Sequence, residues 1–341
     1  MPSFKIAIVG ASTLLGKELK DVLADSPLAA ADLLLLDGEE GRGQLDQVGD
    51  EISFIQAIEP GSFDHVDFTF FCSSEELTAR YWKDALRAGS TVLDLSGALD
   101  GEQAVVVRAP WTGAESASVD LLTPAVVPAH PAALTLALLM DRLSQAAELK
   151  SVVATVLLPA SEFGRAAMDE LHQQTVNLLS FQNLERENYD AQAAFNLLIG
   201  LGESARIRLA NVDQRLRKHL GALSANRWPQ VATQVVQAPV FHGMTFSIAV
   251  DFDRPVDIAA IEEALGGDRI DVVLEDTDSP SNLAATGQDE VLVRVRAEQG
   301  ARAQASRIWI WAAIDNLRLN AQNALECALD LRKLRPRGPV Q

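Results

Sequence analysis

Short apolar runs and stretches with helical spacing alternate over the first 130 residues of the chain. Residues 4–11, with the sequence FKIAIVGA, form a continuous apolar run that predicts a strand, and 14–27 has the apolar spacing of a helix. The alternation continues, with predicted strands at 32–37, 63–74 and 90–97 and a predicted helix at 75–89. Strands separated by helices of this length are typical of a parallel, doubly wound sheet.

The second half of the chain has a different pattern, because apolar and polar residues alternate over long stretches. Residues 234–255 alternate as a long strand pair would, and 164–180 has the spacing of an amphipathic helix. Further elements are predicted as strands at 149–161, 289–299 and 306–315, a closing helix at 315–334 and a loose tail at 335–341. This pattern favours an α+β arrangement with an open, largely antiparallel sheet and helices on one face.

Composition narrows the class of protein. A length of 341 residues with 48% hydrophobic content fits two domains, each with its own core. The net charge of −18 argues against nucleic acid or an anionic membrane as a partner. We find neither an apolar run long enough to span a bilayer nor the basic start of a signal peptide, so we expect a cytoplasmic protein. Two cysteines, Cys72 and Cys327, are too few for a disulfide framework or a structural zinc site, and no metal is predicted.

A glycine-containing turn joins the first predicted strand to the first predicted helix. Gly10 and Gly16 stand at its ends, and Thr13 takes the place of the usual middle glycine, which lets a pyrophosphate approach the backbone. The hydroxyls of Ser12 and Thr13 can still donate hydrogen bonds. Two interpretations stay open, a phosphate-binding turn and a tight strand–helix turn that binds nothing.

An acidic segment follows the second predicted strand. Asp37 stands at the strand end, where a carboxylate accepts hydrogen bonds from a ribose hydroxyl. Together with Glu39 and Glu40 it would repel a 2′-phosphate, and Arg42 is the only cation nearby in sequence. If a dinucleotide binds, NAD is therefore easier to accommodate than NADP. A solvated acidic loop is the alternative.

Several segments in sequence order resemble the aspartate-semialdehyde dehydrogenase family. The glycine turn is similar to the family's Gly-rich opening, and VLDLSGAL at 92–99 to its D-N-S-A-F-R segment. Further similar segments are GRAAMDELHQQT, AAFNLLIGLGE, APVFHGM, AATGQDEVLVRV and WAAIDNLRLNA. The resemblance implies a Rossmann-type dinucleotide-binding domain over 1–130, a dimerisation and substrate domain over 131–314, and a last helix, 315–335, that returns to the first domain. It also implies a homodimer.

The resemblance further implies a chemistry, the reductive dephosphorylation of an acyl phosphate with NADPH. A cysteine thiolate attacks, a histidine moves protons, and two arginines hold the carboxylate and the phosphate. The positions that match these four groups hold Pro131 for the cysteine, Met244 for the histidine, Gln237 for the substrate arginine and Asp100 for the phosphate arginine. None can do the work of the residue it replaces, so we expect the family's reaction to be lost.

Scaffold positions of the family, in contrast, are kept. The matching residues are Gly10, Gly16, Asp94, Ser96, Gly164, Asn196, Gly243, Asp315, Asn316 and Arg318. The candidate cofactor-binding residues are Gly10, Ser12, Thr13, Leu14, Leu15, Gly16, Asp37, Ser73 and Asn316. Pro131 itself suits the first position of a helix, where its missing N–H costs nothing.

Four further residues are candidates to replace the missing groups or to change the charge of the site. His130 and His242 are either a relocated acid/base pair or simply loop and packing histidines, and we expect no adjacent nucleophile for either. Cys72 follows a parallel strand but has no cationic neighbour to lower its pKa, so a small buried hydrophobe is the simpler interpretation. Glu162 adds negative charge near the expected site.

Three functions follow from the sequence. The first is a catalytically silent relative of the dehydrogenase that binds a small molecule, a nucleotide or a protein. The second is an active NAD(P)-dependent oxidoreductase that acts on an aldehyde or acyl substrate by an altered mechanism. The third is a structural partner that forms heterodimers with an active homologue.

Overall fold

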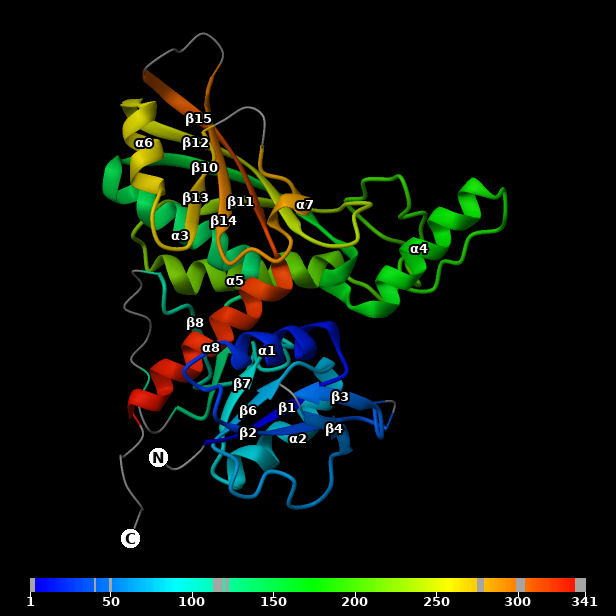
Figure 1. Cartoon of the computed structure of the whole chain (residues 1–341). Coiled ribbons are helices and arrows are strands. Elements are labelled where there is room, and N and C mark those ends of the chain that lie inside the picture. Colours follow the sequence, from blue (N-terminus) through cyan, green and yellow to red (C-terminus); the bar gives the residue numbers. More distant parts are fainter. Residues whose placement is uncertain are drawn as a thin grey trace. The chain divides into compact units, whose positions relative to one another are not determined.

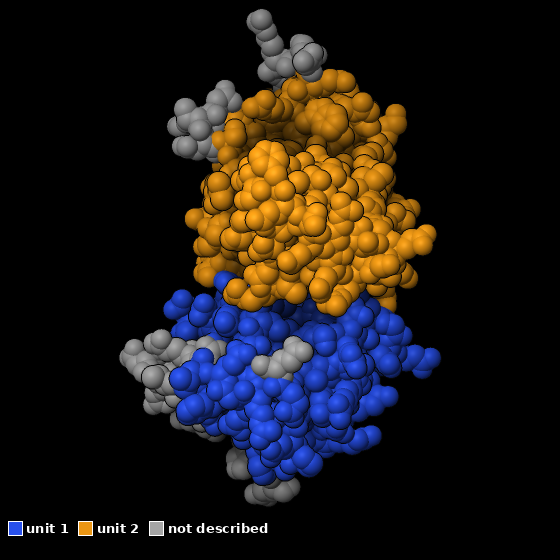
Figure 2. All heavy atoms as spheres, turned by 90° about the vertical axis from the view of Figure 1, so that its right-hand side faces the viewer, with its two compact units in different colours: residues 1–130, 320–341 blue, residues 131–319 orange. Residues whose placement is uncertain are grey.

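The computed structural model describes residues 4–39, 41–48, 51–112, 119, 123–274, 279–298 and 304–334. The chain divides into two compact units, coloured separately in Figure 2. Unit 1 contains residues 1–130 and 320–341, and unit 2 contains residues 131–319. Each unit has a large sheet of its own (Figure 1). Glu40 and the predicted tail at 335–341 lie outside the described residues.

Unit 1 is built on a seven-stranded sheet in the order β5-β2-β1-β6-β7-β9-β8, in which every neighbouring pair is parallel. This confirms the predicted parallel α/β fold. The strands are β1 (Lys5–Val9), β2 (Asp32–Asp37), β5 (Gln56–Ala57), β6 (Phe68–Phe71), β7 (Thr91–Asp94), β8 (Val106–Arg108) and β9 (Ala125–Pro128). The helices are α1 (Leu14–Ala24), α2 (Glu75–Arg87) and the greater part of α8 (Asn316–Leu334), and a separate hairpin joins β3 (Leu45–Val48) to β4 (Glu51–Phe54).

The apolar strands of unit 1 are continuous in sequence because both faces of the sheet are buried. Successive side chains of a strand point to opposite faces, so Ile6 and Ile8 pack into one core while Ala7 and Val9 pack into another. Helices α1 and α8 contribute to the first core and α2 to the second, for example through Trp82. Covering both faces leaves the loops at the strand ends as the accessible part of the sheet.

Unit 2 has a six-stranded mixed sheet in the order β11-β10-β12-β15-β14-β13. Its strands are β10 (Leu149–Leu158), β11 (Val231–Gln237), β12 (Met244–Asp257), β13 (Ile270–Val272), β14 (Val291–Ala297) and β15 (Gln304–Ile314). Its helices are α3 (Pro131–Ala146), α4 (Arg165–Leu179), α5 (Leu209–Ser224), α6 (Ile258–Leu265) and the short α7 (Asn282–Ala285), with a 3-10 turn at Ala160–Phe163. Helices α3, α5 and α6 contact one face of the sheet (Figure 1).

The prediction of a largely antiparallel sheet needs correction. The three central pairings are antiparallel, but β10 with β11 and β13 with β14 are parallel. Both parallel pairs are joined by helix-containing crossovers, which return the chain in the same direction. The predicted strand pair at 234–255 is also wrong, because β10 lies between β11 and β12.

The face of this sheet opposite the helices carries a regular set of outward side chains, which we call the open face. It includes Ser247 on β12, Trp309 and Trp311 on β15, and Arg294 and Arg296 on β14. Ser247 pairs with Trp311 and Trp311 with Arg294, so each row runs straight across neighbouring strands. Trp309 is 47% exposed and Trp311 37% exposed, which is unusual for the centre of a sheet.

Candidate functional site

The glycine turn of unit 1 lies where the loops after β1 and β6 meet, the point at which the strand order reverses. Gly10 has a φ of +86°, and a Cβ added to it would lie 2.7 Å from the backbone nitrogen of Ser73. A Cβ on Gly16 would lie 2.3 Å from the carbonyl oxygen of Gly10. Both glycines are therefore required by the close approach of backbone to backbone. Ligands of doubly wound sheets bind at such a reversal.

Thr13 uses its hydroxyl to close this turn. Its Oγ1 donates to the carbonyl of Gly10 at 2.8 Å and accepts from the N–H of Gly16 at 2.9 Å, so Thr13 is the N-cap of α1. The same oxygen lies 3.1 Å from the carbonyl of Cys72. The side chain that replaces the usual middle glycine is thus committed to the helix start.

The backbone donors of the turn divide into used and available groups. The N–H of Ser12 donates to the Asp37 carboxylate at 3.0 Å, and Gly38 donates to the other oxygen of Asp37 at 2.8 Å. The N–H groups of Leu14 and Leu15, in the first turn of α1, have no acceptor within the described part of the chain. They form the part of the turn that can receive an anion.

The remaining predicted cofactor residues fall in both units. Ser73 lies beside Gly10 and shares a hydrogen bond of 3.1 Å with the Thr78 hydroxyl. Asn316 belongs to unit 2. The predicted counter-ion Arg42 is exposed and lies 3.7 Å from Glu39, a distance at which solvent screens most of the attraction.

Both thiols of the chain belong to unit 1, and both are buried. Burial raises the pKa of the Cys72 thiol, and the nearby carboxylates of Asp94 and Asp37 raise it further. Burial also raises the pKa of Cys327 in α8, where Arg108 only partly offsets the effect. Neither group is a thiolate near neutral pH, which is the form a nucleophile needs.

The four positions expected to lack the family's chemistry lie at the start of α3, at the ends of two strands and in a turn of unit 1, and the buried amide oxygen of Gln237 has no hydrogen-bond partner among the described residues. Pro131 is the first residue of α3 and is buried, with its carbonyl accepting from the Thr135 hydroxyl at 2.8 Å. Met244 begins β12 and is completely buried. Gln237 ends β11 fully buried, and its amide donates to the carbonyl of Ala238 at 2.7 Å. Asp100 belongs to unit 1, where its N–H donates to the Gly97 carbonyl at 3.2 Å.

A chain of polar side chains in unit 2 is centred on His242. Its Nδ1 lies 2.9 Å from the Ser161 hydroxyl, and its Nε2 lies 3.0 Å from the Asp315 carboxylate. The Ser161 hydroxyl also lies 3.2 Å from the amide oxygen of Asn316, and the amide nitrogen of Asn316 donates to Glu162 at 3.2 Å. The structure thus places a hydroxyl beside His242, which corrects the expectation that this histidine has no adjacent nucleophile.

The Asp315 carboxylate is held in its charged form. Burial alone would raise its pKa, but hydrogen bonds from His242 and from the backbone N–H groups of Arg318 and Gly287 outweigh this and lower the pKa. The two backbone bonds measure 3.0 and 2.9 Å. Asp315 therefore remains an anion against which the imidazole of His242 is oriented.

Sequence reasoning singled out His242 but missed Ser161 as its neighbour. The two residues lie 81 positions apart, and no local motif joins them. The contact arises because residues 160–161 run beside residues 240–241, with Ala160 donating to Val240 at 2.8 Å and Ser161 to Phe241 at 2.9 Å. His130, the other histidine of the suggested acid/base pair, is buried in unit 1.

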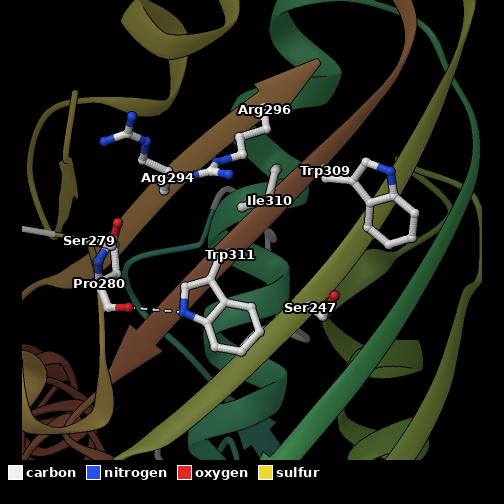
Figure 3. Close-up of a pocket in the computed structure, with 8 residues that line it drawn as sticks. All are labelled: Ser247, Ser279, Pro280, Arg294, Arg296, Trp309, Ile310 and Trp311. Carbon is white, nitrogen blue, oxygen red and sulfur yellow. Dashed lines mark hydrogen bonds between the residues drawn. The ribbon is translucent and has the colours of Figure 1, made fainter. Parts of the chain in front are cut away.

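The open face of unit 2 contains a shallow cavity of about 370 Å³ (Figure 3). Trp309, Trp311, Arg294 and Arg296 line it, and the indole N–H of Trp311 donates to the carbonyl of Pro280 at 2.9 Å. Flat aromatic rings beside guanidinium groups are frequent at protein interfaces. Within the described residues, no cluster of histidine, cysteine and carboxylate groups is placed to hold a metal, and no helix is long and apolar enough to cross a membrane.

The parallel sheet with its glycine turn defines unit 1 as a Rossmann-type domain. A family model described as semialdehyde dehydrogenase, NAD binding domain, matches residues 5–130, and one described as semialdehyde dehydrogenase, dimerisation domain, matches residues 140–319. The chain therefore belongs to the semialdehyde dehydrogenase family, which confirms the resemblance.

Individual relatives span nearly the whole chain. A protein of Pseudomonas aeruginosa named USG-1 protein homolog is 30% identical over 93% of this chain and 94% of its own length. An aspartate-semialdehyde dehydrogenase of Rickettsia conorii is 24% identical over 96% of this chain and 97% of its own length. A solved structure from Pseudomonas aeruginosa, described as a probable aspartate-semialdehyde dehydrogenase, is 29% identical with a TM-score of 0.87, over 97% of this chain and 98% of that one.

Proposed function

We propose that this chain is a member of the family that does not carry out its reductive dephosphorylation and that acts by binding. The observation that supports the proposal is the start of α3, where the structure has Pro131 as the first residue of the helix. We match this position, from the sequence motifs, to the family's cysteine. Both cysteines of the chain lie in unit 1, and burial raises the pKa of each. A thioester intermediate needs a thiolate, so the family's first covalent step has no nucleophile here.

The other three replacements support the same proposal. Met244 cannot accept or donate a proton, and Gln237 carries no charge for a substrate carboxylate. Asp100 carries the opposite charge to the arginine that it replaces. Restoring any one group alone leaves the others missing, so the loss is not a single-residue change.

A steady-state assay tests the proposal. Aspartate semialdehyde, phosphate and NADP are mixed with the protein, and formation of the reduced cofactor is followed by absorbance, with NAD in a parallel series. We expect no turnover above the blank. Saturable turnover that Cys72→Ala abolishes would contradict the proposal, because it would show a working thiol.

A second candidate is an oxidoreductase with an altered mechanism that uses NAD. The observation that favours dinucleotide binding is the pair of available N–H groups at Leu14 and Leu15, next to the Asp37 carboxylate. The two N–H groups suit a pyrophosphate. The Asp37 carboxylate suits an unphosphorylated ribose and repels a 2′-phosphate. The fit is partial, because Asp37 already accepts from the backbone of Ser12.

Calorimetric titration with NAD and with NADP distinguishes the candidates. If the turn holds a dinucleotide, NAD binds at least about tenfold more tightly than NADP, which corresponds to about 1.4 kcal/mol. Asp37→Asn reduces this preference, and the matched control Asp32→Asn, at the exposed start of β2, does not. If neither NAD nor NADP gives a heat of binding, the oxidoreductase candidate is excluded. NAD binding together with turnover that His242→Ala removes would favour it.

We further propose that the protein is a homodimer that pairs through the open face. Exposed indoles at the centre of a sheet, and the match to a family dimerisation domain, support this surface. Light scattering of the purified protein is expected to give the mass of a dimer, and Trp309→Glu to give a monomer. Leu179→Glu, at an exposed position of α4, is the matched control and leaves the dimer intact. A monomeric wild type would contradict the proposal, and co-purification with an active homologue would indicate the heterodimer instead.

A further inference from the structure

Three side chains of unit 2 have the chemical types and the spacing of a hydroxyl nucleophile, its base and an orienting acid. The Ser161 hydroxyl lies 2.9 Å from Nδ1 of His242, and Nε2 of the same ring lies 3.0 Å from Asp315. Each distance is a normal hydrogen bond. A nucleophile bonded to a base that is itself oriented by a third group is the arrangement that activates serine hydroxyls.

We propose that Ser161, His242 and Asp315 form an acyl-transfer site for small uncharged or cationic acyl esters. This goes beyond the proposed function, which concerns the loss of the family's thiol chemistry. The site uses none of the four replaced positions.

The hydrogen bonds fix the direction of proton movement. Asp315 is an anion and cannot donate, so the Nε2–H of His242 donates to it, and Nδ1 of the neutral ring is left as an acceptor. The Ser161 hydroxyl has one proton and two acceptors within reach, Nδ1 at 2.9 Å and the amide oxygen of Asn316 at 3.2 Å. Attack on an acyl carbon uses the arrangement in which the hydroxyl donates to the nearer acceptor, Nδ1. When Nδ1 takes the proton, Asp315 stabilises the imidazolium that forms.

The reaction balances with water as the only co-reactant. The Ser161 oxygen forms a bond to the acyl carbon while its proton moves to Nδ1 of His242. The ester's carbon–oxygen bond breaks, and the departing alcohol takes that proton. Water then attacks the acyl-serine with its proton passing to Nδ1, and the serine hydroxyl and a carboxylic acid are released.

The surroundings define the class of ester. Ser161 is only 2% exposed, whereas the side chain of His242 is 24% exposed, so access along the imidazole edge admits only small acyl groups. The Glu162 carboxylate accepts a hydrogen bond from the amide nitrogen of Asn316, whose amide oxygen lies 3.2 Å from the Ser161 hydroxyl. This negative charge disfavours carboxylate-bearing acyl groups.

Covalent labelling of the native protein tests the proposal directly. The full chain is incubated with phenylmethylsulfonyl fluoride, a compact reagent for activated serines, and the modified peptide is mapped by mass spectrometry. Hydrolysis of p-nitrophenyl acetate is followed in parallel. We expect one modification, on Ser161, together with a loss of ester hydrolysis.

One variant and one control sharpen the result. His242→Gln is expected to slow labelling of Ser161 by about 100-fold or more, the usual contribution of a positioned general base. Ser180→Ala, an exposed serine at the end of α4, is expected to change nothing. An unlabelled Ser161 in the folded wild type would overturn the proposal, and so would labelling that is unaffected by His242→Gln. The first of these results needs no variant to fold.

Asp315 acts through His242 and is a positioning residue. Its role is measured by nitrogen NMR of the imidazole, which distinguishes the two tautomers. We expect the Nε2–H tautomer in the wild type and a gain of the Nδ1–H tautomer in Asp315→Asn. An unchanged tautomer would assign Asp315 a purely structural role and would overturn the three-residue site.

Discussion

The glycine turn of unit 1 and the His242 chain of unit 2 are both polar, but they are built in opposite ways. In the turn the backbone itself does the work, and two N–H groups, of Leu14 and Leu15, are left available. In the His242 chain the links from Asp315 through His242 and Ser161 to Asn316 join side chains, and Asp315 is held in addition by two backbone N–H groups. The turn depends on the close backbone approach at Gly10 and Gly16 and on one hydroxyl, that of Thr13, which caps α1. The chain depends on the identity of each group.

Of the predictions on these two regions, adding a methyl group to Gly16 should change the free energy of unfolding the most. Its Cβ would lie 2.3 Å from a backbone oxygen that cannot move without shifting β1, so we expect Gly16→Ala to lower the free energy of unfolding by about 3 kcal/mol. Urea denaturation measures this. The control is Gly221→Ala in α5, which like Gly16 has no positive φ but has open space around the added Cβ, so it should not destabilise the protein, since alanine favours a helix over glycine by up to about 1 kcal/mol. Equal costs would show that the turn does not depend on close approach.

Removing the Asp315 charge tests how far the His242 chain depends on the identity of its groups. Asp315→Asn should lower the free energy of unfolding at neutral pH by about 2 kcal/mol, because two backbone donors and His242 lose a charged acceptor. The folded-state pKa of Asp315 lies below its ordinary value of 3.8. Its stabilisation is therefore present above that value and is lost as the pH falls through the lowered pKa. The difference between variant and wild type should shrink over that range, and a constant difference would contradict it.

Thr13 distinguishes a capping hydroxyl from a ligand-binding one. Thr13→Ala removes the N-cap of α1 and should cost about 1 kcal/mol of unfolding free energy. Thr13→Ser keeps the hydroxyl and should cost much less. Thermal unfolding of the two variants compares them. A neutral Thr13→Ala would mean that the hydroxyl is free for another role.

The smallest effect is expected at an ion pair that belongs to neither region. Asp251 accepts from Arg307 and from the Ser151 hydroxyl, and these bonds lower its pKa to about 2. Carbon NMR titration should show this value in the wild type and a value nearer 3.8 in Arg307→Ala. The contribution of Asp251 to stability is present above its ordinary pKa and lost as the pH falls toward 2. An Asp251 that titrates near 3.8 in both proteins would show that the pair does not form in solution.

The sequence predicted the parts of the molecule that depend on local pattern. Continuous apolar strands such as Lys5–Val9 predicted the parallel sheet, and the glycines predicted the turn at its edge. Alternation in the second half predicted strands but not their partners, because alternation specifies a buried face and carries no information on strand direction. The mixed order around β10 depends on crossovers that no local pattern shows.

The features of the candidate site likewise fall into those that a local motif predicts and those that only the structure shows. The proposed replacement of the family's cysteine by Pro131 rests on sequence motifs alone. The bond between Ser161 and His242 could not be predicted from a motif, since it joins segments 81 residues apart and depends on the pairing of residues 160–161 with 240–241. Asp315 was singled out as a scaffold residue, and only the structure gives it a histidine partner.

The central claim is that the family's scaffold persists here without its thiol chemistry. The most direct test is intact-mass and peptide mass spectrometry after incubation with aspartate semialdehyde and NADP, quenched in acid to preserve thioesters. The account predicts unmodified Cys72 and Cys327, because both thiols are buried with raised pKa values. A thioester adduct on either cysteine would contradict it.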